Sequence, residues 1–135
     1  MPRTFGFLVS VVLLAACTSS GGAGDEPRTI EVRMTDDLRF DPSHIDVRVG
    51  ETVRFELINS GQVVHEFLIG DEEEQAEYAR EMGEGGHGAH SDESVEPGGR
   101  STIEYTFAEA GELLAGCHEP GHYEGGMVAT ITVAE

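Results

Sequence analysis

From Thr29 onward, apolar residues recur at every second position in several short stretches of the chain. Such alternation places successive side chains on opposite faces of an extended strand, so each stretch predicts a β-strand with one buried face. Turn residues such as Gly50 and Glu51 separate the stretches. About seven or eight short strands of this kind are typical of an all-β sandwich of two packed sheets. The alternating apolar residues are Ile30, Val32, Met34, Ile45, Val47, Val49, Val53, Phe55, Leu57, Ile103, Tyr105, Phe107, Ala129, Ile131 and Val133, and a further short strand is expected near Leu113 to Cys117.

One segment departs from this alternation. Asp71 to Met82 is rich in helix-forming residues and has acids in its first turn, where the helix dipole favours them. The glycine-rich residues that follow, up to Pro97, predict a loop. Residues 71–97 contain ten acids and one arginine, which gives a net charge of −9. We expect this short helical insertion to stand in solvent.

Residues 1–16 have the organisation of an export leader, with Arg3 before an apolar stretch that ends in small residues. The apolar stretch, Phe5 to Ala16, is too short to span a bilayer. Residues 14–17, Leu-Ala-Ala-Cys, resemble the lipobox of bacterial lipoproteins, which implies cleavage before Cys17 and lipidation of that cysteine. The alternative is an ordinary secretory leader with an incidental cysteine.

Residues 17–28 are small and polar, which predicts a flexible tether between the lipidated Cys17 and one folded domain over residues 29–135. The predicted location is therefore extracytoplasmic, with the domain anchored to a bacterial membrane. The 26 acids and 8 arginines of the chain give a formal net charge of −18. This charge argues against nucleic acid as a partner, because phosphate backbones need a basic surface. We expect a monomer that associates with basic proteins or cations.

Cys17 and Cys117 are the only cysteines in the sequence of 135 residues. Lipidation of Cys17 would leave Cys117 without a disulfide partner, although exported proteins commonly form disulfides. Cys117 lies in the stretch GCHEPGHYEGGM, where four residues separate it from His122 and four more separate His122 from Met127. One loop therefore offers a thiolate, an imidazole and a thioether, and this combination favours a soft metal.

A second imidazole comes from His65, which interrupts the apolar stretch VVHEFLI. A histidine in such a strand is, by itself, more often a buried and hydrogen-bonded residue than a ligand. Beside the thiolate loop, however, it completes two imidazoles, one thiolate and a weak axial thioether, the donor set of a blue-copper site. Zinc is the alternative, but a closed structural zinc site takes a fourth nitrogen, oxygen or thiolate donor rather than a thioether.

These motifs resemble those of the cupredoxin family, the blue copper proteins of the plastocyanin and azurin type, and among them the small bacterial lipoproteins. The resemblance covers residues 29–135 and rests on FDPSHIDVRVGETVRFELIN, on VVHEFLIG and on the Cys-x4-His-x4-Met loop. It implies a Greek-key sandwich and one copper ion that alternates between Cu(II) and Cu(I). The implied ligands are His65, Cys117, His122 and Met127. The implied docking face beside the loop histidine consists of Pro120, Gly121, Tyr123 and Gly125.

Copper enzymes that share part of this motif fit the sequence poorly. In multicopper oxidases a histidine also follows the cysteine, as His118 does here, but that family expects another histidine where this chain has Gly116. The dinuclear copper domain of cytochrome oxidase needs two cysteines in the loop. We therefore predict a one-electron carrier that is not an enzyme and whose redox partners have a basic docking face. A lipoprotein that buffers, delivers or detoxifies copper through the same site is the alternative.

The remaining histidines are less informative. His44 is expected in a turn at the surface. His87 and His90, in the stretch GGHGAH, could hold a second, weaker metal ion with Asp92 or Glu93. A solvated loop without metal is the alternative, because ordering a glycine-rich segment costs conformational entropy.

Glu66 and His118 each follow a predicted ligand directly. In many cupredoxins, an asparagine and a serine or threonine at these two places are hydrogen-bonded to each other. The resemblance implies that the backbone N–H of Glu66 points at the Cys117 sulfur and that the two side chains meet as a clamp behind the ligands. Such a clamp would raise the pKa of His118. Two solvated side chains that point apart are the alternative.

Overall fold

The fold was analysed in a computed structural model, which describes Met1, residues 26–83 and residues 94–135. The predicted leader, Cys17, His87 and His90 lie outside the described residues. Strands dominate the rest of the chain, together with one helix. The elements are β1 (Arg28–Thr35), β2 (Arg39–Asp41), β3 (His44–Arg48), β4 (Thr52–Asn59), β5 (His65–Glu66), β6 (Leu68–Gly70), α1 (Glu72–Gly83), β7 (Ser94–Val95), β8 (Arg100–Thr106), β9 (Gly111–Gly116) and β10 (Val128–Ala134).

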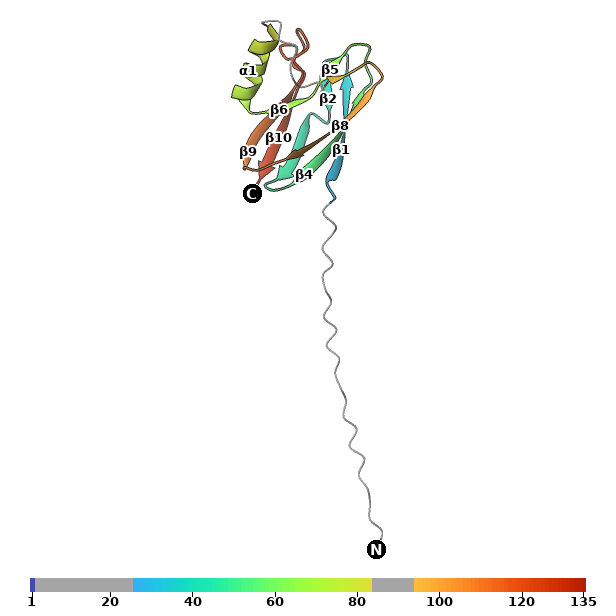
Figure 1. Ribbon diagram of the computed structural model, residues 1–135, viewed down its shortest axis with the longest axis vertical. Helices are drawn as coiled ribbons and strands as arrows, with labels where there is room; N and C mark the ends of the chain where they lie inside the picture. The colour runs from blue at the N-terminus through green and yellow to red at the C-terminus, as the bar shows by residue number, and fades with distance from the viewer. Residues whose placement is uncertain (2–25, 84–93) are drawn as a thin grey trace.

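The strands form two four-stranded sheets, with the orders β2-β1-β4-β8 and β3-β10-β9-β6, and β5 pairs with β7 beside them. The pairs β1/β4 and β3/β10 are parallel, and the other pairs are antiparallel. The chain therefore crosses from one sheet to the other several times (Figure 1). The predicted all-β sandwich is confirmed. The described chain has more strands than predicted because β2, β5 and β7 are only two or three residues long.

The core lies between the two sheets and consists mainly of the alternating apolar residues. Val32, Val53, Leu57 and Ile131 are fully buried. Val49, which was expected to face inward, is 42% exposed because β3 ends at Arg48 and Val49 begins the turn to β4. Three phenylalanines join the sheets through ring contacts: the Phe67 ring centroid lies 5.2 Å from that of Phe40 and 5.4 Å from that of Phe55.

Helix α1 packs beside β6 and β9, at the end of the sandwich opposite the start of β1 (Figure 1). A capping box begins the helix: the backbone N–H of Glu74 donates to the Asp71 carboxylate at 2.9 Å, and the Glu74 carboxylate accepts from the backbone N–H of Asp71 at 2.7 Å. The helix is too short and too polar to cross a membrane, and no other helix occurs in the described part of the chain.

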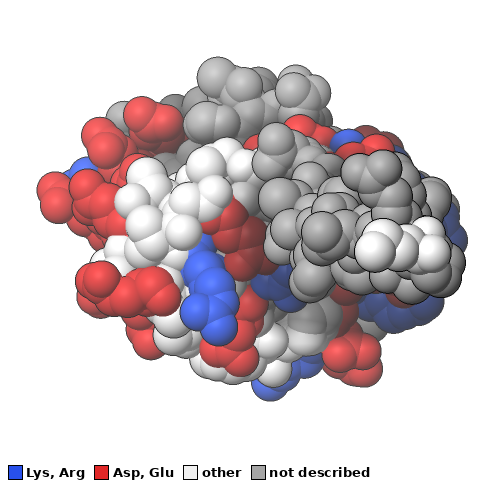
Figure 2. Space-filling view, turned by 90° about the horizontal axis from the view of Figure 1, so that it is seen from below, with Lys and Arg blue, Asp and Glu red and all other residues white. Residues whose placement is uncertain are grey.

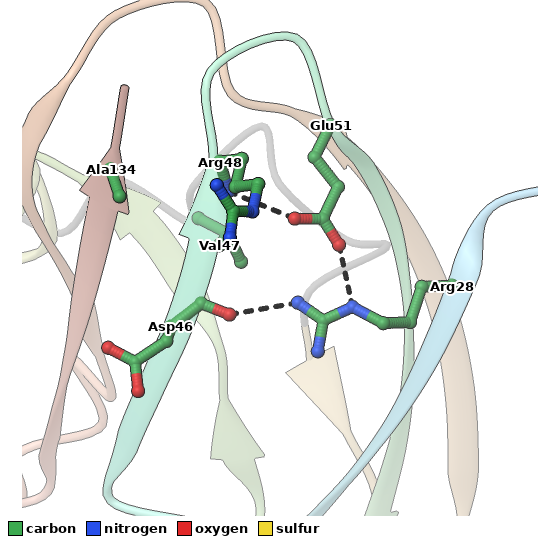
Figure 3. Close-up of a pocket in the computed structure, with 6 residues that line it drawn as sticks. All are labelled: Arg28, Asp46, Val47, Arg48, Glu51 and Ala134. Atoms are coloured by element: carbon green, nitrogen blue, oxygen red, sulfur yellow. Dashed lines mark hydrogen bonds and ion pairs between the residues drawn. The ribbon is translucent and has the colours of Figure 1, made fainter.

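The end of the sandwich where β1 begins has a mixed surface charge, with acids and arginines interspersed (Figure 2). A cavity of about 480 Å³ lies at this end, lined by Arg28, Asp46, Val47, Arg48, Glu51 and Ala134 (Figure 3). Its polar groups bond to one another: Arg28 donates to Glu51 at 2.6 Å and to the Asp46 carbonyl at 2.9 Å. Since these contacts tie β1 to the β3–β4 turn, we assign the cavity a structural role.

Candidate metal centre

His65 enters the site from β5, which follows the loop after β4. The Asn59 side chain holds this loop, because its amide donates to the carbonyl of Val63 at 2.7 Å and to that of Val95 at 2.8 Å. The Asn59 side-chain oxygen accepts from the backbone N–H of Gly61 at 2.8 Å. Asn59 is 1% exposed, and His65 is fully buried. A satisfied polar side chain at the end of β4 therefore fixes the path of the chain into the site.

The other predicted donors lie on the loop between β9 and β10. Cys117 follows the last residue of β9, and its backbone N–H donates to the carbonyl of Met127 at 3.1 Å. The backbone N–H of Met127 donates in turn to the carbonyl of His122 at 3.0 Å. Gly121 has a φ of 81°, a conformation that suits glycine, and it turns the chain just before His122. Backbone hydrogen bonds thus link the predicted donor residues of the loop.

Three of the four predicted donors converge within the described part of the chain. The ligand atoms of His65, Cys117 and His122 all lie within 4.8 Å of one another. The Sγ of Cys117 is 4.0 Å from the Nδ1 of His65 and 3.3 Å from the Nδ1 of His122. Met127 is fully buried, and the backbone hydrogen bonds described above link it to Cys117 and His122.

These distances test whether a metal ion fits. Metal–sulfur and metal–nitrogen bonds of about 2.3 and 2.0 Å at trigonal angles would separate sulfur from nitrogen by about 3.7 Å. The two observed separations, 3.3 and 4.0 Å, lie on either side of that value. A small metal ion therefore fits with little movement of the side chains. A soft thiolate with two imidazoles and a nearby thioether favours copper over zinc.

Burial raises the pKa of the Cys117 thiol to about 11, against the opposing effect of hydrogen bonds from the backbone N–H groups of Glu66 and Glu119. The thiol is therefore protonated near neutral pH until a cation replaces the proton. Burial also lowers the pKa of His65, so that its imidazole stays neutral and can act as a ligand. Metal binding at this centre should accordingly release a proton from the sulfur.

Asp36 contacts the far side of the His65 ring, with its Oδ1 at 3.3 Å from Nε2. Hydrogen bonds, first of all from the backbone N–H of Gln62, lower the pKa of Asp36 and keep it ionised. When Nε2 carries the proton and donates to Asp36, the lone pair of Nδ1 faces the cluster. Asp36 was not identified from the sequence, since a polar residue in a distant turn shows no pattern that links it to His65.

The expected arrangement of Glu66 and His118 is half right. The backbone N–H of Glu66 does donate to the Sγ of Cys117, at 3.3 Å. The predicted side-chain clamp is wrong, because both side chains bond to other groups. The Nε2 of His118 lies 2.7 Å from the Oε1 of Gln75. The Oε1 of Glu66 accepts from Tyr78 and from Ser94, each at 3.3 Å. The pKa of His118 is also lowered by burial instead of raised.

Helix α1 causes this difference. Its acidic side chains are exposed as expected, but Gln75 and Tyr78 are buried, so the insertion does not stand wholly in solvent. The ring of Tyr78 packs edge-on against His118, with centroids 5.1 Å apart. The Oε2 of Glu66 is buried and has no hydrogen-bond partner among the described residues. The helix thus contributes side chains behind the metal centre that the acidic sequence pattern did not reveal.

The other predicted residues lie as follows. His44 begins β3 at the surface, where its Nε2 is 3.2 Å from the Asp46 carboxylate. The predicted docking residues Pro120, Gly121 and Tyr123 line a surface cavity of about 190 Å³, whose other wall is the C-terminal end of α1. His122, next to these residues, is partly exposed. The loop face is therefore the side on which the centre approaches the surface.

The two-sheet fold and the His-Cys-His cluster are those of a blue copper protein. The sequence profile described as Cupredoxin-like domain matches residues 6–133, and the chain belongs to this family. Its relatives include two proteins named copper-resistant cuproprotein CopI. That of Rubrivivax gelatinosus is 40% identical over 116 residues, which cover 84% of this chain and 70% of the relative. That of Pseudomonas aeruginosa is 36% identical over 143 aligned positions, which cover 82% of this chain and 78% of the relative.

Solved structures of two auracyanins share the fold. The dithionite-reduced auracyanin of Roseiflexus castenholzii has a TM-score of 0.70 and 27% identity, with 79% of this chain and 97% of that chain covered. Auracyanin A of Chloroflexus aurantiacus, described as a "blue" copper protein, has a TM-score of 0.68 and 25% identity, with 80% and 99% covered. Both comparisons support the assignment of the fold and of one copper site.

Proposed function

We propose that the protein holds one copper ion between His65, Cys117 and His122, with Met127 as a weak axial donor, and that it carries single electrons. The convergence of two Nδ1 atoms on one buried sulfur carries this proposal. The bound metal would supply the Cu(II)/Cu(I) couple. The protein supplies a largely buried site, since His65, Cys117 and Met127 are fully buried.

The arrangement of the donors favours electron transfer over catalysis. A catalytic metal site keeps one coordination position open for water or substrate. Here His65, Cys117 and His122 converge on one buried point, and backbone hydrogen bonds join Met127 to both Cys117 and His122. A rigid cage that suits both oxidation states lowers the reorganisation needed for each electron transfer. We therefore propose that the protein is not an enzyme.

A second candidate function is copper handling. The two relatives at 40% and 36% identity are named copper-resistant cuproproteins. The same thiolate and imidazoles that carry an electron could withhold copper from other molecules or pass it on. The two functions differ in how readily the copper ion leaves the site. Both functions depend on the single copper site.

We also propose an extracytoplasmic location. The support is the leader-like composition of residues 1–16 and the lipobox-like residues before Cys17. Lipidation at Cys17 would anchor the domain to a bacterial membrane through the polar tether. The proposed partners are redox proteins with a basic face, because the chain carries a formal net charge of −18.

One experiment compares the two functions on purified, copper-loaded protein. Stopped-flow absorbance measures electron exchange with a basic cytochrome, and a second mixing experiment measures copper loss to a Cu(I) chelator. Rapid electron exchange with copper retained supports the carrier. Rapid loss of copper with slow electron exchange supports handling. A protein that binds no copper, or binds it without thiolate charge-transfer absorption, contradicts both proposals.

A further inference from the structure

Gln75 is a neutral polar side chain of α1 that is 1% exposed. Its amide Nε2 donates to the carbonyl of Leu68 at 2.9 Å and to that of Leu114 at 3.1 Å. These carbonyls belong to the neighbouring strands β6 and β9. Its Oε1 lies 2.7 Å from the Nε2 of His118. One side chain therefore bridges two strands and the residue that follows Cys117.

The chemistry of these contacts fixes both side chains. Both N–H bonds of the Gln75 amide are directed to carbonyl oxygens, so only Oε1 remains for His118, and it must accept. The Nε2 of His118 must then carry a proton. A flipped Gln75 amide would place its oxygen against two carbonyls, which repel it. Gln75 and His118 consequently have one compatible orientation and one compatible tautomer.

The surrounding packing leaves the His118 ring little freedom. Tyr123 stacks on it with centroids 4.7 Å apart and an interplanar angle of 13°, and Tyr78 meets it edge-on. On the other side of Cys117, a Cβ added to Gly116 would lie 2.5 Å from the Oε1 of Gln75. The Gln75 side chain therefore packs closely against both residues that flank the sulfur donor.

We propose that Gln75 is a positioning residue for Cys117. It packs against Gly116 on one side of the cysteine and bonds to the His118 side chain on the other, and Tyr78 of the same helix bonds to Glu66 next to His65. The side-chain link between the two ligand segments, expected as a direct contact of Glu66 with His118, thus runs through α1. This inference rests on the proposed copper site, but part of its test needs no metal.

The metal-free test measures how readily Cys117 reacts with a thiol reagent. In the Gln75→Leu variant of the full chain, three hydrogen bonds of the buried amide are lost. Alkylation of Cys117, followed by peptide mass spectrometry so that Cys17 is counted separately, should become about ten-fold faster, the order expected for local opening after loss of buried hydrogen bonds. Val53→Ala, a core substitution in β4, is the control for general loss of stability. Equal alkylation rates in the two variants at matched Tm would overturn the proposal.

The test with copper uses a double-mutant cycle with His118→Phe, which keeps a ring between the two tyrosines and removes Nε2. Each single substitution should shift the thiolate charge-transfer band and speed copper loss to a chelator by about ten-fold. The effect of the double variant should be smaller than the sum of the two single effects, because with both side chains apolar neither Gln75 nor His118 is left facing an unpaired polar group of the other. Additive shifts, or an unchanged band in Gln75→Leu, would show that Gln75 only stabilises the fold. Absence of copper binding in the unmodified protein would instead contradict the proposed function and leave the alkylation result valid.

Discussion

The backbone N–H of Glu66 donates a hydrogen bond to the sulfur of Cys117, across 51 positions of sequence. The donor belongs to the residue directly after His65, so the segment of one predicted ligand stabilises the charge of another. This bond favours the thiolate and opposes the effect of burial, which raises the pKa of the thiol. Hydrogen bonds to a copper-bound sulfur are also one of the factors that set the potential of a blue-copper site.

Replacing Cys117 by serine should abolish the intense colour of the Cu(II) form, because the absorption arises from charge transfer between thiolate and copper. Visible absorption of the copper-loaded variant measures this directly. His44→Gln, a change at an exposed histidine in β3, should keep the colour. A coloured Cys117→Ser protein would mean that the ligand set is wrong.

Replacing Met127 by leucine should leave copper bound but raise the reduction potential, because loss of a sulfur donor destabilises Cu(II). The two side chains have similar volumes, so the fully buried site should lose less than about 1.5 kcal/mol of stability. Potentiometric titration and thermal unfolding of the same samples measure the two effects. An unchanged potential would remove Met127 from the proposed donors.

Replacing Asp36 by asparagine should raise the potential and lower Cu(II) affinity by roughly ten-fold. The variant loses the negative charge that favours Cu(II), and its single side-chain oxygen cannot accept from both the Nε2–H of His65 and the backbone N–H of Gln62. Asp37→Asn, at the exposed neighbour, removes the same charge without this contact and is the matched control. Equal shifts of potential in the two variants would mean that the contact of Asp36 with His65 has no effect beyond general charge.

The negative charge of the protein predicts how salt affects its reactions. Association with a basic cytochrome should slow as salt rises, since screening shortens the range of attraction to about 10 Å at 0.1 M. An anionic redox partner should show the opposite trend. Second-order rate constants from stopped-flow mixing at several salt concentrations test both. A flat dependence with the basic partner would mean that the negative charge of the protein has no role in docking.

The ion pair of Arg28 and Glu51 predicts a loss of stability in acid. Burial of Glu51 opposes ionisation, but hydrogen bonds from Arg28 and the backbone of Arg48 together hold its pKa below the ordinary value of 4.5. A lowered pKa means that ionised Glu51 stabilises the fold above pH 4.5 and that this contribution disappears as pH falls through the folded-state value. Glu51→Gln should therefore cost about 1 kcal/mol at pH 7 and progressively less below pH 4.5.

Urea unfolding at pH 7 and at pH 3 measures this difference. Glu104→Gln is the control, since both side chains of the Arg54–Glu104 ion pair are about half exposed. Exposed pairs of this kind contribute little, so the control should change stability by less than about 0.5 kcal/mol at either pH. A cost for Glu51→Gln that stays constant with pH would show that hydrogen bonding of a neutral side chain, and not ionisation, is responsible.

Much of the fold and of the metal centre could be predicted from the sequence. Strand alternation identified Val53, Phe55 and Leu57 as inward-facing, and all three are fully buried. The loop donors could be found because Cys117 and His122 are close in sequence and chemically distinctive. His65 was recognisable only in combination with that loop, since a lone histidine in a strand is usually structural.

The groups behind the ligands could not be found in this way. Gln75 and Tyr78 lie three positions apart on a helix whose other side chains are mainly charged or small, so they form no apolar stripe. The partners of Gln75 are backbone carbonyls on β6 and β9, which have no residue-specific signal. The direct contact of Glu66 with His118 was expected from the resemblance to other cupredoxins, and the sequence did not show that Tyr78 contacts both side chains.

The unequal burial of the predicted ligands has a consequence for how the protein could be regulated. His65, Cys117 and Met127 are fully buried, whereas His122 is partly exposed. Electrons and copper ions would then enter and leave the site by the same route, past the partly exposed imidazole of His122. A redox protein seated there would shield the ion from chelators for as long as it stayed. Occupancy by partners, rather than any change in the ligands, could in this way decide how long the domain keeps its copper.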